Sequence, residues 1–173
     1  MDLTDVDIDD FAAPDGPKKK KDDVQPGCYV ACVDELKDGL SNAGNRMLTL
    51  EAVISEGHYK GKRLRHWFVV ENKWGKVDFK RFLKAISSTN EAPDKFTDEM
   101  KRHCLGKEFR IGVGLEYHGG WLNPRIICLG NLKDDEQDFN KRLEKALTAL
   151  EKKNDKAINP PKAEFVASGD VQF

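Results

Sequence analysis

The chain of 173 residues lacks any long hydrophobic run. No segment reaches the roughly 18 apolar residues of a membrane-spanning helix. The first ten residues carry five Asp and no basic residue, which is the opposite of the charge that secretory and transit peptides carry. These two absences predict an intracellular protein, located in the cytoplasm, that makes no contact with a membrane.

Cysteine is scarce, and its four positions do not have the spacing of a metal site. The four residues are Cys28, Cys32, Cys104 and Cys128. Structural zinc sites commonly use C-x₂-C or H-x₃-H pairs, and the sequence has neither. The cysteines are therefore predicted to be reduced and to behave as small apolar side chains. A zinc site that adds His103 or His118 to the first two cysteines is the alternative.

The short motifs of common enzymes are absent as well. The chain has no P-loop, no G-x-S-x-G, no H-E-x-x-H and no G-x-G-x-x-G that opens a helix. Gly112 and Gly114 lie inside an expected strand, where they predict either strong curvature or the close approach of a ligand backbone. The sequence thus predicts a protein that is not an enzyme, with no catalytic residues, no metal and no cofactor.

An overall excess of one charge is also missing, because 29 Lys and Arg face 30 Asp and Glu. The distribution is nevertheless uneven. Residues 46–110 hold fifteen basic and nine acidic side chains, a net of +6, and the amino-terminal end is acidic. Acidic ends around a basic middle suggest that the middle binds a polyanion.

The basic middle is densest at residues 57–84, which hold nine Lys or Arg, two acids and six aromatic residues. Basic side chains neutralise phosphates, and flat rings stack on unpaired bases. A charged strand is by itself usually only a solvated face. The position of this stretch in the fold therefore determines whether it indicates a binding surface.

Alternating and helical patterns predict the elements of the fold. Five strands are expected at 27–36, 46–56, 60–71, 106–118 and 121–132. A helix is expected at 77–88, after a turn at 72–75, and a short one after the capping residue Thr97. Strand-strand-strand-helix-strand-strand is the order of the OB-fold, a five-stranded Greek-key barrel of the all-β or α+β class, which binds oligonucleotides on the face of its second and third strands.

The predicted domain organisation has four parts. They are a disordered segment at 1–25, the OB-like domain at 26–132, a helix at 133–156 and a flexible tail at 157–173. Phe139, Leu143 and Leu150 form an apolar stripe on the carboxy-terminal helix, which is expected to pack either on the barrel or against a second copy of the chain.

Four segments of the sequence resemble a known family. They are PGCYVACV, NRMLTLE from Asn45 to Glu51, GHYKGKRLRHWF and GKEFRIGV. Together they resemble the bacteriophage family called domain of unknown function 669, over about residues 26–129. The resemblance implies a phage replication or recombination protein with an OB-like barrel that binds single-stranded DNA. It supplies no catalytic residues.

Strand parity selects the candidate binding residues. Phe68 is expected to face the core, whereas Trp67 faces outward beside Arg63 and Arg65, and Phe79 and Phe82 are expected to be core anchors. Trp67 and Trp74 are predicted to stack on bases, with Tyr59 and Trp121 as second candidates. The predicted phosphate contacts are Lys60, Lys62, Arg63, Arg65, Lys73 and Lys76.

Two further interpretations concern partners. The chain ends on Phe173 with Asp170 nearby, and this end resembles the partner-docking tails of single-strand binding proteins, although an ordinary disordered end is the alternative. The whole domain is alternatively an adaptor that holds a helicase, primase or recombinase, or an RNA-binding OB module. Formation of homo-oligomers is compatible with each interpretation. Either the acidic amino terminus or the carboxy-terminal tail is expected to cover the basic groove and to compete with DNA.

Overall fold

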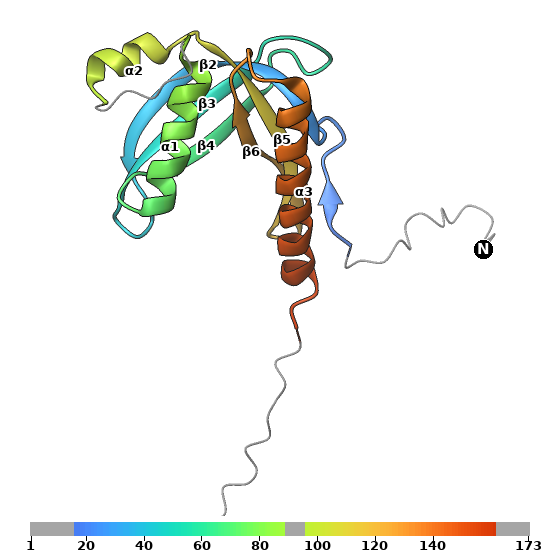
Figure 1. Ribbon diagram of the computed structural model, residues 1–173. Coiled ribbons are helices and arrows are strands. Elements are labelled where there is room, and N and C mark those ends of the chain that lie inside the picture. Colours follow the sequence, from blue (N-terminus) through green and yellow to red (C-terminus); the bar gives the residue numbers. More distant parts are fainter. Residues whose placement is uncertain (1–15, 89–95, 162–173) are drawn as a thin grey trace, which may run out of the picture.

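The computed structural model describes residues 16–88 and 96–161. This part of the chain forms one mixed sheet and three helices (Figure 1). No helix in it is long and apolar enough to cross a membrane. The elements are β1 (Lys18–Lys19), β2 (Gly27–Leu40), β3 (Arg46–Ile54), β4 (Arg63–Val69), α1 (Lys73–Ile86), α2 (Asp98–Cys104), β5 (Glu108–His118), β6 (Trp121–Gly130) and α3 (Glu136–Ile158).

The six strands are joined in the order β1-β6-β5-β2-β3-β4. All neighbours are antiparallel except β1 and β6, which are parallel. The sequence did not predict β1. Among the described residues no ladder joins β4 to β6, so the sheet is open and the predicted closed barrel is not shown. The two strands nevertheless lie close to each other.

Helix α1 covers the inner face of the sheet with two phenylalanines. The ring centroid of Phe68 on β4 lies 5.3 Å from that of Phe79 and 5.4 Å from that of Phe82. Phe82 also packs edge-on against Phe109 of β5 at 5.7 Å. The rings of Phe68, Phe82 and Phe109 are fully buried. The prediction that Phe79 and Phe82 belong to the core is therefore confirmed.

Helix α3 packs on the opposite, outer face, where it runs along β5 and β6 (Figure 1). Two glycines of β5 allow it to come close. A Cβ atom at Gly112 would lie 2.5 Å from Cδ1 of Leu143, and one at Gly114 would lie 2.6 Å from Cδ2 of Leu150. The apolar stripe of α3 thus packs on its own sheet, and α3, not a ligand backbone, occupies the space beside the glycines. The predicted curvature is supported by a register shift between Gly112 and Val113.

Helix α1 begins earlier than the sequence predicted. Residues 73–75, expected as part of a turn, form its first turn. The side chain of Asn72 accepts a hydrogen bond of 2.6 Å from the backbone N–H of Gly75, which makes it a helix cap. Thr97 caps α2 in the predicted way by accepting from Met100 N–H. Lys73 and Trp74 therefore project from a helix rather than from a loop.

Candidate nucleic-acid interface

The outer face of β4 presents the three side chains that strand parity predicted. In the ladder with β3, Trp67 is opposite Thr49 and Arg65 is opposite Glu51. Trp67 keeps 39% of its surface exposed, whereas its neighbour Phe68 on the inner face is fully buried. An exposed indole on a strand flanked by guanidinium groups is a surface on which an unpaired base can stack.

The two arginines beside Trp67 are already engaged by carboxylates. Arg63 forms an ion pair with Asp34 of β2, and its Nη1 also lies 3.8 Å from Glu51. Arg65 donates a hydrogen bond of 2.9 Å from its Nε to Glu51. The side chain of Glu51 is only 10% exposed. A phosphate at this position would therefore have to compete with two acids for the guanidinium groups.

Trp67 also contacts β6, at the open seam of the sheet. The guanidinium carbon of Arg125 lies 4.8 Å from the centroid of the Trp67 ring, which is the geometry of a cation–π contact. Arg125 in turn donates a hydrogen bond of 3.1 Å to Glu116 of β5, and Lys153 of α3 pairs with the same carboxylate. A continuous chain of contacts thus links α3 to β4 across the outer face.

The pKa of Glu116 reflects this network. Burial raises the pKa of the Glu116 carboxyl, but hydrogen bonds and positive charge from Lys153 and Arg125 outweigh burial and hold it below its ordinary value. The carboxylate is therefore ionised at neutral pH and keeps Arg125 in place beside Trp67.

Trp121 lies on the same outer face as Arg125. Residues 121, 123 and 125 of β6 share one parity, and Arg125 is opposite Gly114, on which α3 packs. Trp121 is 40% exposed, and the Nζ of Lys18 on β1 lies 5.7 Å from its ring centroid. Trp121 and Arg125 are four positions apart along the strand, a span of roughly 13 Å. The outer face therefore carries two exposed indoles, those of Trp67 and Trp121, and two cations beside them, Arg125 and Lys18.

Trp74 is the most exposed tryptophan, at 78%. It stands in the first turn of α1, which lies directly against the end of β4, since a Cβ atom at Gly75 would come within 1.8 Å of the Val69 carbonyl oxygen. Only Gly fits at this contact. The close approach places Trp74, Lys73 and Lys76 just past the end of the strand that carries Trp67.

The turn between β3 and β4 carries the remaining predicted residues. Tyr59 is half-buried and packs edge-on against Tyr29, with ring centroids 5.7 Å apart, so its ring is partly used by the fold. Lys60 and Lys62 are exposed. Of the predicted phosphate contacts, four lysines make no ion pair within the described part of the chain: Lys60, Lys62, Lys73 and Lys76.

Arg125 and Lys18 are the site residues that sequence reasoning missed. Arg125 interrupts an apolar strand, LNPRIIC, and this was the available signal. Asp170 and Phe173, predicted to dock a partner, lie outside the described residues. In the two described ranges no three His, Cys, Asp or Glu side chains converge in a way that could hold a metal ion.

Comparison with known families gives a match over most of the described fold. Residues 15–124, more than half of the chain, match the family described as protein of unknown function (DUF669). The matched segment begins just before β1 and ends within β6, so it includes Trp67 and Trp121 but stops one residue before Arg125. A comparison with curated proteins gives no match. The chain therefore belongs to the DUF669 family of proteins of unknown function.

Proposed function

We propose that this protein binds single-stranded DNA, largely without sequence specificity, by base stacking and phosphate contacts. The observation that carries the proposal is the outer surface of β4 and β6, where Trp67 and Trp121 are exposed on one face and Arg125 lies beside Trp67. Single-strand binding surfaces combine stacking rings with cations along a groove and need no base-specific hydrogen bonds.

The order of the strands supports an OB-type architecture for this function. Strands β2 to β6 follow the order strand-strand-strand-helix-strand-strand, with α2 as an addition before β5. The contact between Trp67 and Arg125 brings β4 against β6, which would complete a partly open barrel. In OB-folds nucleic acid binds across the second and third strands, and these correspond to β3 and β4.

The ion pairs of the surface divide the phosphate contacts into two groups. The four unpaired lysines are available without any rearrangement, whereas Arg63 and Arg65 must first leave Asp34 and Glu51. For single strands, the logarithm of the binding constant falls with the logarithm of salt concentration by about 0.7 for each phosphate neutralised. Four contacts give a slope of about −3, and six give about −4.

The setting of this activity follows from the family resemblance. We propose a role in phage DNA replication or recombination, in the cytoplasm of the host cell, with other proteins of those processes as partners. The adaptor alternative depended on the apolar stripe of α3, and that stripe packs on β5. RNA remains a competing ligand, because stacking on Trp67 does not distinguish the two sugars.

The direct test is titration of the full chain with oligo-dT while tryptophan fluorescence is recorded, at about 50 and 200 mM salt. We expect quenching, and a binding constant that falls with salt at a slope of about −3. Duplex DNA and oligo-U serve as controls. Absence of both quenching and salt dependence would overturn the proposal, and tighter binding of oligo-U would reassign the protein to RNA.

A further inference from the structure

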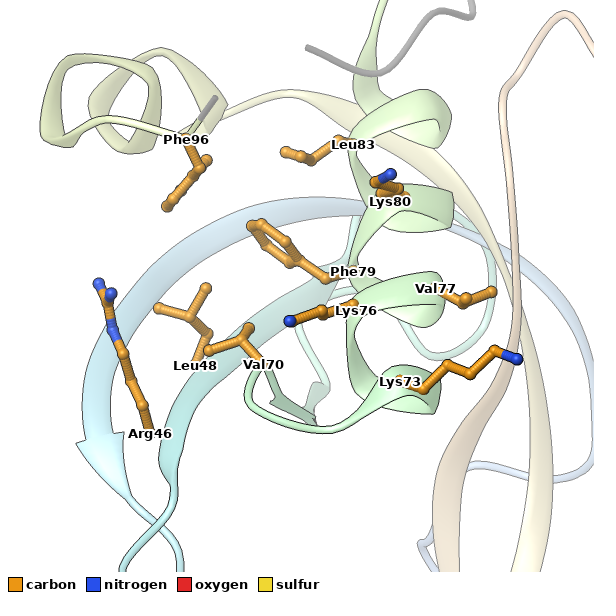
Figure 2. A pocket seen from close by; sticks show the side chains of 10 residues that line it. All are labelled: Arg46, Leu48, Val70, Lys73, Lys76, Val77, Phe79, Lys80, Leu83 and Phe96. Carbon is orange, nitrogen blue, oxygen red and sulfur yellow. The ribbon is translucent and has the colours of Figure 1, made fainter. Parts of the chain in front are cut away.

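A cavity of about 530 Å³ lies between α1 and the first part of β3 (Figure 2). It is on the inner side of the sheet, away from the surface of Trp67 and Trp121. Of the residues that the structure describes, six apolar side chains and four cations line it, and no acidic side chain does. The apolar residues are Leu48, Val70, Val77, Phe79, Leu83 and Phe96, and the cations are Arg46, Lys73, Lys76 and Lys80.

The polar and apolar groups have separate places in this cavity. Phe79 and Lys76 project from α1 toward Leu48 and Val70, and Arg46 stands at the opposite side (Figure 2). Leu48 and Phe79 are buried and form a floor, whereas Lys76 and Lys80 are exposed. Among the described residues only Arg46 of the four cations has an acidic partner, Asp38, at 3.5 Å.

This lining fits an apolar side chain flanked by carboxylates. Apolar floor atoms gain free energy when another apolar group displaces water from them. A nucleobase would bring polar edges next to side chains that offer no hydrogen bond, and burial of unpaired polar atoms is unfavourable. The cations around the floor favour an acidic ligand, so the matching chemistry is an acidic segment with interspersed hydrophobic residues.

The chain itself contains such a segment at residues 2–11, DLTDVDIDDF. We propose that this segment binds in the cavity of its own chain, with apolar side chains on the Leu48–Phe79 floor and aspartates near Lys76, Lys80 and Arg46. The segment has five Asp, no basic residue and the apolar residues Leu3, Val6, Ile8 and Phe11. Ten residues of chain separate Val6, in the middle of the segment, from Gly16, where the described chain starts, and an extended chain of that length spans up to about 35 Å.

Occupation of the cavity has a consequence for the candidate interface. Lys73 and Lys76 line the cavity and also belong to the lysines available for phosphate. An acidic segment held there would neutralise part of the surface that single-stranded DNA needs, and the two would compete. This consequence rests on the proposed function, whereas occupation of the cavity does not.

Photo-cross-linking in the full chain tests the inference without any nucleic acid. Val6→p-benzoylphenylalanine places a photoreactive group in the middle of the segment, outside the described fold. After irradiation, we expect peptide mapping to join position 6 to Leu48, Val70, Phe79 or Phe96 of the same chain. Adding Lys76→Glu and Lys80→Glu to the same variant should lower the cross-link yield at least about five-fold, since the attraction is electrostatic. High salt should lower the yield of the parent variant to a similar extent for the same reason.

A matched control keeps this result specific. Lys141→Glu with Lys145→Glu reverses the same number of charges at the same four-residue spacing on the exposed side of α3, and should leave the yield unchanged. Circular dichroism verifies that each variant is folded. Cross-links to the outer face near Trp67, cross-links between two chains, or equal yields in both double variants would overturn the inference. DNA binding measured separately would be unaffected by that outcome.

Discussion

The guanidinium of Arg125 on β6 lies over the indole of Trp67 on β4, its carbon 4.8 Å from the ring centroid, although among the described residues no ladder joins the two strands. The contact brings together strands that are not neighbours in the sheet and leaves part of the indole exposed. Through Glu116 and Lys153 it extends to α3. One pair of residues therefore contributes both to the curvature of the sheet and to the candidate binding surface.

Loss of this contact should destabilise the protein. Arg125→Met keeps most of the side-chain length but removes the cation–π contact and the hydrogen bond to Glu116, so we expect the free energy of unfolding to fall by about 1–2 kcal/mol. Urea denaturation measures the change, and the tryptophan emission maximum reports the altered environment of Trp67. Arg102→Met, at an exposed position of α2, is the control and should change neither quantity.

Sequence parity was sufficient to place Trp67 outside and Phe68 inside, because a strand with one buried face alternates strictly. It could not supply Arg125, which is 58 residues away in sequence and meets Trp67 only because the sheet curls. Nor could it show that Glu51, on the neighbouring strand, engages Arg63 and Arg65. Such pairings depend on strand order and register, which local patterns do not determine.

The start of α1 shows a different limit. Asn72-Lys73-Trp74-Gly75 has the composition of a turn, yet Asn is also a favoured helix cap. The packing of residue 75 goes with the helix: the first turn of α1 lies so close to the Val69 carbonyl that only Gly fits at this position. The spacing of Phe79 and Phe82 did predict the buried face of the same helix, because a periodic apolar face is a strong signal.

The three tryptophans should differ in their contribution to DNA binding. Trp67→Ala and Trp121→Ala each remove a ring of the outer surface, so each should weaken oligo-dT binding by roughly 1–3 kcal/mol, about 5- to 150-fold. Trp74→Ala tests whether the bound DNA extends past the end of β4 to the first turn of α1. Fluorescence anisotropy with labelled oligo-dT gives the affinities. Unchanged binding in all three variants would exclude stacking on these indoles.

Removal of Glu51 should release the arginines beside Trp67. Glu51→Gln preserves shape but abolishes the charge that engages Arg63 and Arg65, so oligo-dT should bind more tightly at low salt. The salt slope should steepen by about 0.7 for each guanidinium that gains a phosphate. Glu144→Gln on the exposed side of α3 removes one carboxylate elsewhere and should leave the slope unchanged. An unaltered salt slope in Glu51→Gln would show that Arg63 and Arg65 contribute to the fold and make no phosphate contact.

The depressed pKa of Glu116 predicts a stability that depends on acid pH. A carboxyl with a lower pKa in the folded state stabilises the fold above its unfolded pKa, and this contribution disappears as pH falls through the folded pKa. Glu116→Gln should therefore be less stable than the parent chain at neutral pH, and the difference should shrink below pH about 4.5. Denaturation at several pH values measures it, and a constant difference would contradict the assignment.

The glycines under α3 should tolerate a methyl group to different degrees. At Gly112 a Cβ atom would lie 2.8 Å from the Cβ of Cys128, which is fixed to the backbone of β6. At Gly114 the two nearest atoms, on Leu150 and Ile127, are ends of side chains that can rotate away. Gly112→Ala should therefore cost more than Gly114→Ala, within the range of about 1–3 kcal/mol typical of overpacking.

Gly39 on β2 supplies the matched control for this comparison, because nothing lies within 4 Å of the Cβ position there. Gly39→Ala should leave the free energy of unfolding unchanged or slightly higher, since alanine restricts the unfolded chain. Thermal or urea denaturation of the three variants gives the order. Equal tolerance at Gly112 and Gly39 would mean that α3 does not pack on β5 as closely as the glycine contacts require, and the apolar stripe of α3 would again be available to a partner.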